Sequence, residues 1–410
     1  MDGKADSADG NFRALIFALL ALACGHMLST LLRTIPAVSL DVMAADFRTA
    51  PQTLGSLTSI YHFAFAASQI PVGAAMDRFG VRPVSLSLLA GTIVGALASG
   101  LATGPAGFLF GQLLLGIATS GMLMCPMTLA AKQMSAARFG LWSGIILSIG
   151  NIGMLLSASP LAFVVEQFGW RAGFWISAGL GAAVALAVFL LVPKQPAEHA
   201  DPSSPLSQMA EVLRIGLSRP LRGLVALALV SLAATLVLRG LWGGPWLMEV
   251  KALGRVEAGN VLGLFTLALI IGPVLMGMLD RAFGHRREVL AATHALAALL
   301  LALTAAGAPN YPLSEWVGVK AVPAQIDGAL FVLMGIAIST QPLLFGMTRQ
   351  MAGAQNAGKA LSAINLAFFL GTALMQSVTG VVATIFGLPA VLLFMAAALI
   401  IGVIVFLICT

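Results

Sequence analysis

Two arginines lie inside long apolar stretches of this sequence, and their chemistry is that of anion binding. Arg33 falls in the first expected helix and Arg239 in the seventh. A charge at the centre of a membrane costs about 2.5–3.5 kcal/mol on insertion scales. None of the sixteen acidic residues falls in the middle of an expected helix, so no carboxylate compensates these cations. A bound anion would do so, because a guanidinium presents a planar fork that matches a carboxylate or phosphate.

Polar residues in the same helices extend this candidate site. His26 and Thr30 precede Arg33 at steps of four and three, which places all three on one helix face. A polar group inside a membrane either contacts the solute or hydrogen bonds to a neighbouring helix. The candidate solute-binding residues are Arg33, Arg239, His26, Thr30, His62, Asn151, Thr235, Trp242, Asn365 and Gln376.

The two arginines are expected to face each other across a central cavity at similar depth. The alternative is that both lie in the outer third of the membrane, where a long side chain reaches the interface at little cost. The sequence Trp-Gly-Gly-Pro-Trp at 242–246 also has two interpretations. Gly-Gly-Pro interrupts helical hydrogen bonding and can act as a hinge, whereas the tryptophans form either a gate or part of the aromatic belt at the membrane surface.

Soft donors in helices 1 and 4 offer a second chemistry. Thiolate and thioether ligands select Cu(I). The alternative metal-ligating residues are Cys24, His26, Met27, Met122, Met124 and Cys125. They follow no strict ligand spacing, and Met is a routine apolar filler, so the primary interpretation includes no metal and no cofactor. A neutral vitamin or an amphipathic drug is a further alternative, because a cavity lined by Met and Phe could hold one.

The composition requires that membrane helices position these residues. The chain of 410 residues is 59% hydrophobic and 9% charged, with a mean hydropathy of +0.97. These values exclude a cytosolic enzyme, a disulfide-stapled secreted domain and a β-barrel. Apolar runs of about 20 residues recur, each long enough to cross the hydrocarbon core. Twelve helices are predicted, near 14–40, 54–75, 84–102, 107–130, 139–165, 172–192, 223–247, 259–279, 289–307, 327–347, 360–385 and 389–409.

Charge placement predicts the orientation and the domain boundaries. Most Lys and Arg residues fall on the same side as the N-terminus, so both termini are expected to be cytoplasmic in a bacterial inner membrane. The longest polar stretch lies at the midpoint and contains a short amphipathic helix. The predicted organisation is a cytoplasmic tail at 1–13, a six-helix bundle at 14–192, a cytoplasmic linker at 193–222 and a second six-helix bundle at 223–410.

The two bundles are similar to each other in sequence, as expected for a duplicated six-helix unit. Glycine positions and short motifs recur at corresponding places in both halves. The matched features are Gly116 with Gly335, Gly153 with Gly371, Phe168-Gly169 with Phe386-Gly387, and Asp77-Arg78 with Asp280-Arg281. Two parallel copies enclose a cavity that rocking of one half against the other exposes to each side in turn.

A motif after the second predicted helix carries a resemblance to a known family. Residues 73–82 read G-A-A-M-D-R-F-G-V-R, with the key positions Gly73, Asp77, Arg78, Gly80 and Arg82. This motif resembles the one that members of the major facilitator superfamily carry between their second and third helices. The twelve predicted helices and the central loop also resemble that family. The resemblance implies alternating access, with these residues latching the cytoplasmic side. Gly73 permits close helix approach, and the arginines can bind carbonyls at helix ends.

Within the family, the arginine of helix 1 resembles that of the organophosphate and organic-anion porters. Other features depart from the drug exporters, since Gln112 stands before Gly116 where family members commonly carry an Arg. The full antiporter motif is also missing from helix 5. The sequence therefore favours a porter of anions over a proton-driven drug exporter.

The predicted function is secondary transport of a small organic anion by a monomer embedded in the lipid bilayer. Coupling to protons or to a counter-anion, and the direction of transport, stay open. No phosphate-binding loop, H-E-x-x-H motif or nucleophile elbow occurs, so the chain is not expected to be an enzyme or to bind nucleic acid. A sensor that keeps the fold without transport is the least favoured alternative, because the motif at 73–82 is intact.

Overall fold

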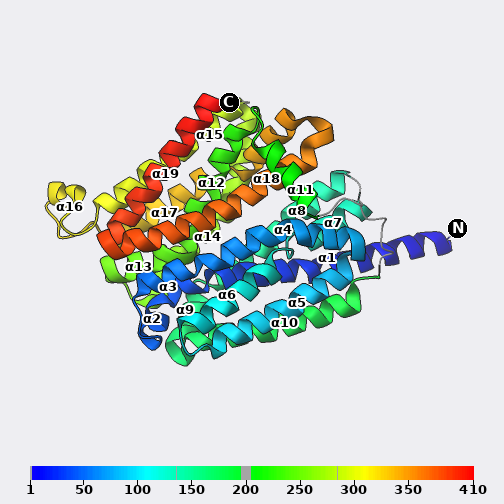
Figure 1. The fold of residues 1–410 in the computed structure, drawn as a ribbon, viewed down its shortest axis with the longest axis horizontal. Coiled ribbons are helices and arrows are strands. Elements are labelled where there is room, and N and C mark those ends of the chain that lie inside the picture. The colour runs from blue at the N-terminus through cyan, green and yellow to red at the C-terminus, as the bar shows by residue number, and fades with distance from the viewer. Residues whose placement is uncertain (1, 135, 195–204, 284) are drawn as a thin grey trace.

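The protein is described by a computed structural model that covers residues 2–134, 136–194, 205–283 and 285–410, and within them the regular structure is entirely helical. Figure 1 shows two bundles side by side, the first half in blue to green and the second in green to red. The first half contains α1 (Asp2–Thr34), η1 (Ile35–Val38), α2 (Leu40–Asp46), α3 (Pro51–Leu57), α4 (Ser59–Phe79), α5 (Val81–Leu101), α6 (Pro105–Thr119), α7 (Met124–Gln133), α8 (Ala136–Leu156), α9 (Ser159–Phe168) and α10 (Trp170–Leu191).

The second half begins after the central connection. Its helices are α11 (Pro205–Gly216), α12 (Arg222–Val237), η2 (Leu238–Trp242), α13 (Gly243–Pro245), η3 (Trp246–Val250), α14 (Arg255–Phe283), α15 (Arg286–Ala306), α16 (Pro312–Val317), α17 (Ala324–Ile338), α18 (Gln341–Phe386) and α19 (Leu388–Cys409). α11 lies within the predicted linker, of which residues 195–204 lie outside the described part of the chain.

Eleven helices among the described residues are long and apolar enough to cross a membrane. They correspond to the predicted spans with one exception, because α4 is absent from that set. α4 is long enough, at 21 residues, but it carries Tyr61, His62 and Gln69, which lower its hydropathy. It nevertheless packs against α6 and α18 inside the bundle. The chain is a multi-pass membrane protein, and the count of twelve spans stays a prediction.

Several predicted helices are interrupted or extended. The spans expected at 54–75, 139–165 and 327–347 are each divided between two helices. The span expected at 107–130 is divided into α6 and α7. The span expected at 223–247 passes from α12 into two π-helical segments, η2 and η3, on either side of Gly243–Pro245. The interruption expected there is confirmed, since Pro245 has no backbone N–H to donate and Gly favours irregular backbone. The helix expected at 360–385 is longer at its N-terminal end, since it forms part of α18, which begins at Gln341.

Equivalent contacts in the two halves support the internal repeat. Gly169 and Gly387 both adopt positive φ, of 78° and 80°, immediately before α10 and α19. A left-handed backbone of this kind favours glycine over residues with a Cβ. Arg82 donates to the carbonyl of Phe189 at 2.6 Å. In the second half, Arg287 donates to the carbonyl of Leu407 at 2.7 Å, so the same tie between helix ends occurs twice.

The two halves meet closely at one end of the molecule, called here the distal end and formed by α2, α3, α9 and α13, on the side away from the N-terminus in Figure 1. Glycines of the second half touch backbone of the first at three places there. A Cβ on Gly244 would overlap the Ala37 carbonyl oxygen. Equivalent contacts join Gly259 to Ser159 and Gly380 to Ser56. The distal end is therefore closed in this structure.

An ion pair adds to this closure. Arg255, at the start of α14, forms two hydrogen bonds with the Asp41 carboxylate of α2, at 2.9 and 2.7 Å. The same guanidinium donates to the carbonyl of Val38. Ser159 also donates to the Asn260 side chain at 2.5 Å. A bidentate pair supported by a third acceptor is more strongly oriented than a single contact between flexible side chains.

Candidate functional site

Arg33 is the uncompensated cation of the site. It lies in the last turn of α1, and its Nε is buried without a hydrogen-bond partner. No hydrogen bond or ion pair joins this guanidinium to any residue that the structure describes. Its Cζ instead lies 6.0 Å from the ring centroid of Phe369 on α18. Arg33 of the first half thus reaches the second half through an aromatic face, with its hydrogen-bonding capacity unused.

Further aromatic rings follow from the Phe369 contact. On α4, Tyr61 and Phe65 lie one helical turn apart with ring centroids separated by 6.1 Å. The Phe65 ring meets Phe369 across the two halves at 4.1 Å, with 33° between the ring planes. The Tyr61 ring also lies against His62, with centroids 5.0 Å apart. We call the following residues the central cluster: Arg33, Tyr61, His62, Phe65, Phe369 and Gln376.

Two polar contacts join the halves beside these rings. His62 Nδ1 donates to Gln376 Oε1 at 2.9 Å, while His62 Nε2 is buried without a partner. Asn365 donates from Nδ2 to Gln69 Oε1 at 2.5 Å. The structure therefore brings three predicted site residues, Arg33, His62 and Gln376, into one cluster. Asn365 lies on the same helix as Phe369 and Gln376 but is engaged with α4.

Arg239 occupies a different environment from Arg33. It is fully buried, and its Nε donates to Thr266 Oγ1 of α14 at 2.7 Å. Its Nη2 donates to the Met154 carbonyl and to Ser157 Oγ, so the side chain crosses from the second half to α8 of the first. Nη1 has no hydrogen-bond partner. Most hydrogen bonds of Arg239 therefore hold the two halves together. An arginine that only reached the membrane interface would not form these buried contacts.

The two arginines lie close together along the helix axes. A Cβ on Gly240, the residue after Arg239, would come 3.6 Å from the Arg33 carbonyl oxygen and 3.6 Å from the Thr34 side chain. Ser157 Oγ lies 2.5 Å from Thr34 Oγ1 and accepts from Arg239 Nη2 at 3.3 Å. These contacts place the two backbones at about the same depth, while the two side chains reach different partners.

The face of α12 that leads to Arg239 carries unused polar atoms. Ser231 Oγ and Thr235 Oγ1 are both buried without a hydrogen-bond partner. Most helical Ser and Thr residues in this chain donate back to a carbonyl one turn earlier, as Thr266 does to Leu262 at 2.8 Å. Thr235 Oγ1 therefore has no hydrogen-bond partner among the described residues, and its contact with a solute stays a prediction.

The polar residues on α1 mainly serve packing against α8. Thr30 Oγ1 donates to the Met27 and Gly150 carbonyls. A Cβ on Gly150 would overlap the His26 ring, so this glycine makes room for the imidazole. Asn151, the next residue, is half-buried. His26 and Thr30 thus position α1, which carries Arg33.

Trp242 and Trp246 are both buried, so neither belongs to an aromatic belt. Trp242 donates from Nε1 to Thr379 Oγ1 at 2.9 Å, and its ring packs against Gly55 of α3. Trp242 therefore bridges the halves at the distal end, as the gate interpretation requires. Trp246 lies within the second half and donates to Asp327 Oδ2 at 2.7 Å.

The soft donors do not converge on one point. Cys125 Sγ lies 3.6 Å from Met76 Sδ, and Met124 packs against Gly73. Met122 lies against Gly25, whereas His26 faces α8. Cys24 and Met27 are half-buried. Among the described residues no three His, Cys, Asp or Glu side chains are placed to hold a metal ion.

The residues of the 73–82 motif lie where α4 turns into α5. Gly80 provides the turn with a φ of 85°. Arg82 binds the end of α10, as described above, which confirms the expected arginine-to-carbonyl contact within the first half. Arg78 is exposed with its Cζ 5.2 Å from the Phe79 ring centroid. The side chain of Asp77, and those of its counterparts Asp280 and Arg281, lie outside the described residues.

A buried ion pair was not anticipated from the sequence. Lys251 Nζ lies 3.3 Å from Asp327 Oδ2, and both side chains are only 1% exposed. The same ammonium donates to the Gly307 and Val322 carbonyls at 2.8 Å. Asp327 begins the helix predicted at 327–347, and no local pattern indicates that Lys251 packs against it. The pair holds the end of η3 against α17.

Phe65 and Phe369 are the site residues that sequence reasoning missed. Phe65 follows Tyr61 by four residues and His62 by three, so the helix-face argument that selected Thr30 could have found it. Phe369 precedes Gln376 by two turns and could have been found in the same way. Their contact could not be foreseen, because the two residues lie 304 positions apart in the sequence.

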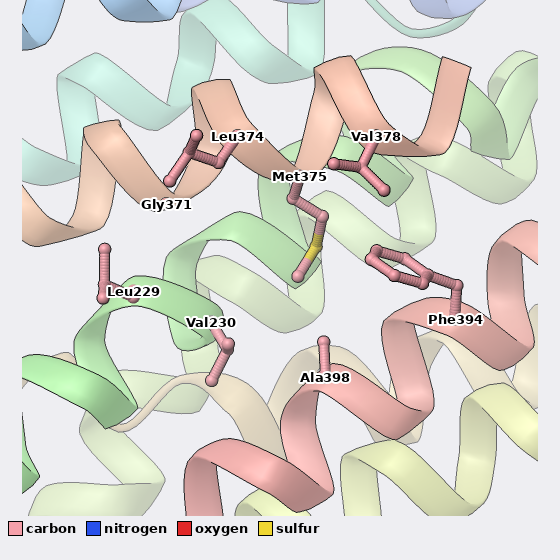
Figure 2. Close-up of a pocket in the computed structure, with 8 residues that line it drawn as sticks. All are labelled: Leu229, Val230, Gly371, Leu374, Met375, Val378, Phe394 and Ala398. Atoms are coloured by element: carbon pink, nitrogen blue, oxygen red, sulfur yellow. The ribbon is translucent and has the colours of Figure 1, made fainter. Parts of the chain in front are cut away.

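A separate apolar pocket lies away from this cluster. Figure 2 shows it between α12, α18 and α19, with a volume of about 180 Å³. Its lining is apolar throughout: Leu229, Val230, Gly371, Leu374, Met375, Val378, Phe394 and Ala398. Leu374 and Val378 are exposed on the outside of the bundle, so the pocket opens toward lipid. It contains none of the predicted site residues.

Comparison with known proteins agrees with this architecture. The family model of the Major Facilitator Superfamily matches residues 22–254. The solved structure of a POT family transporter in complex with 5-aminolevulinic acid superposes with a TM-score of 0.78, at 14% identity and 95% coverage of both chains. A mutant of the nucleoside transporter NupG gives 0.75, at 14% identity, with 96% of this chain and 99% of that chain covered. These structures share the fold.

Curated relatives cover shorter parts of the chain. A tetracenomycin C resistance and export protein from Streptomyces glaucescens is 30% identical over 46% of this chain and 35% of its own length. A putative niacin/nicotinamide transporter from Bacillus subtilis is 24% identical over 55% of this chain and 57% of its own length. The chain spans about a third to a half of the length of the first curated relatives it matches. The family match covers more than half of the chain and agrees with the duplicated helical fold, so the chain belongs to the Major Facilitator Superfamily.

Proposed function

We propose that this protein is a secondary transporter that moves a small organic anion by alternating access. The observation that carries the proposal is Arg33, a guanidinium between the two halves with no hydrogen bond or ion pair to any described residue. A charge in that position is costly unless a partner compensates it. A carboxylate or phosphate ester is the partner that a planar guanidinium binds best.

The arrangement of the halves supports alternating access. The distal end is closed by three glycine contacts and by the Asp41–Arg255 ion pair. All of these contacts cross between the halves, so rocking of one half against the other would break them together. With both termini on the cytoplasmic side of a bacterial inner membrane, this arrangement is the state closed to the outside.

The relatives are consistent with small-molecule transport but differ in their named solutes. One is named for tetracenomycin C and another for niacin or nicotinamide. The copper alternative has little support, because the sulfur ligands do not converge. A neutral aromatic solute remains the competing candidate, since rings line the central cluster.

Isothermal titration of the purified full-length protein in detergent tests the proposal. A panel of carboxylates, phosphate esters and neutral amides would be compared between wild type and Arg33→Gln. We expect at least one anion to bind the wild type and to lose at least tenfold in affinity in the variant, because charged hydrogen bonds contribute about 1.5–3 kcal/mol.

The matched control is Arg13→Gln, which removes an exposed arginine from the same helix. Its affinity should equal that of wild type. Unchanged anion binding in Arg33→Gln, or binding of neutral amides alone, would overturn the assignment of an anionic solute.

A further inference from the structure

We propose that the transported anion is an aromatic carboxylate, whose ring stacks between Phe65 and Phe369 while its carboxylate binds Arg33. This inference rests on the proposed function and specifies its substrate class. It is carried by the juxtaposition of an unpaired guanidinium with two rings that come from opposite halves of the molecule.

The Phe65–Phe369 contact is the first part of the argument. Phe65 belongs to α4 of the first half and Phe369 to α18 of the second, and their centroids are 4.1 Å apart. The two rings are in direct contact, closer than the separations of about 4.5–7 Å at which offset aromatic pairs are favourable, so a solute ring can enter only when the two halves move apart. A planar ring then replaces the single contact between Phe65 and Phe369 with two ring contacts. An aliphatic ring of the same size is thicker and has no π face, so its contacts with the two phenylalanine rings contribute less binding free energy.

The position of Arg33 fixes where the charge must lie. Its Cζ lies over the Phe369 ring, 6.0 Å from the centroid. A carboxyl group attached directly to an aromatic ring lies close to the ring plane. A ring stacked on Phe369 can therefore direct its carboxylate toward the Arg33 guanidinium. The solute carboxylate then meets a guanidinium that has no hydrogen-bond partner among the described residues.

His62 indicates a preference for a donor on the ring. Its Nδ1 donates to Gln376 Oε1, so Nε2 carries a lone pair, and that atom is buried without a partner. The His62 ring also lies against Tyr61, with centroids 5.0 Å apart. A hydroxyl group on the aromatic ring could donate to Nε2. A hydroxybenzoate is therefore expected to bind more tightly than benzoate.

The experiment compares four probes by isothermal titration of the full-length protein in detergent. Benzoate carries ring and charge, cyclohexanecarboxylate carries charge without aromaticity, benzamide carries the ring without charge, and 3-hydroxybenzoate adds a donor. We expect benzoate to bind at least tenfold more tightly than cyclohexanecarboxylate and benzamide, and 3-hydroxybenzoate to bind more tightly still.

Ring variants identify the source of that preference. Phe369→Leu should reduce the ratio of benzoate to cyclohexanecarboxylate affinity to near one. Phe65→Leu should lower the same ratio, so the test can still be made if one of the two variants fails to fold. Phe110→Leu, at an exposed ring on α6, is the matched control and should keep the wild-type ratio.

The outcomes separate this inference from the proposed function. Equal binding of benzoate and cyclohexanecarboxylate, both lost in Arg33→Gln, would overturn the aromatic assignment and leave the anion transporter standing. A tenfold ratio that persists in both Phe65→Leu and Phe369→Leu would also overturn it. If none of the anions binds, or if benzamide binds as well as benzoate with no effect of Arg33→Gln, both proposals fail.

Discussion

At the scale of single residues, the two arginines of the membrane helices have different environments despite their similar places in the repeat. Arg33 meets only an aromatic face, whereas Arg239 forms hydrogen bonds with Thr266, Met154 and Ser157. Met154 and Ser157 belong to the first half and Thr266 to α14 of the second, so Arg239 holds the two halves together. The sequence alone indicated two cations and could not distinguish them, because carbonyl acceptors become partners only through tertiary packing.

Substitution of each arginine should therefore affect a different step. Arg33→Gln is expected to weaken anion binding at least tenfold, as argued above. Arg239→Gln keeps a donor but loses charged contacts to the Met154 carbonyl and Ser157, so binding should change less than threefold while transport slows at least tenfold. Titration in detergent and uptake into proteoliposomes measure the two properties separately.

Equal loss of binding in both variants would return Arg239 to the solute site. Arg239→Lys provides a control, because it keeps the charge but not the forked geometry. It should transport faster than Arg239→Gln and more slowly than wild type.

At the scale of elements, much of the fold could be predicted because its determinants are local. Hydropathy located most membrane helices, and the repeated Phe-Gly motif marked turns that both adopt positive φ. The sequence predicted that the helix is interrupted near Gly243–Pro245, but it did not predict that the segments on either side are π-helical. The contacts across the central cluster were not predictable, since Phe65 and Phe369 belong to different halves.

The buried Lys251–Asp327 pair should be important for the stability of the second half. Lys251→Met leaves the Asp327 carboxylate buried without its counter-ion, and removing one member of such a pair costs roughly 3–5 kcal/mol. Thermal unfolding in detergent should show a marked loss of melting temperature. The double variant Lys251→Met with Asp327→Leu should recover part of that loss, because no unpaired charge remains. A double variant less stable than both singles would contradict this account.

Gly244 provides a test of close packing at the distal end. A Cβ there would overlap the Ala37 carbonyl oxygen, so Gly244→Ala forces α13 away from η1. We expect the distal end to open, seen as a longer spin-label distance between Thr53→Cys and Glu315→Cys, which are exposed on opposite halves. Gly179→Ala is the matched control, because no atom lies within 4 Å of its added Cβ. Equal distances in both variants would show that the contact does not hold the end closed.

At the scale of the whole molecule, closure of the distal end should depend on pH through Asp41. Burial raises the pKa of this carboxyl, but the hydrogen bonds and charge of Arg255 outweigh burial and hold the pKa below its ordinary value of 3.8. A group with a depressed pKa in the closed state stabilises that state above its ordinary pKa and loses the effect as the pH falls through the depressed value. Closure should therefore be constant from about pH 5 to 8 and weaken below about pH 4.

The spin-label pair Thr53→Cys and Glu315→Cys measures this dependence directly. Asp41→Asn should show at neutral pH the loosened distances that wild type shows only in acid, with a shift of the closed population worth about 1 kcal/mol or less, because the carboxylate is 37% exposed. A residual pH dependence of equal size in Asp41→Asn would assign the titration to another group. Loss of closure at this pair is expected to leave the Arg33 site intact, since the central cluster is built from α1, α4 and α18 and shares no residue with the ion pair. The molecule would then separate two tasks by depth, with solute binding in the central cluster and closure at the distal end.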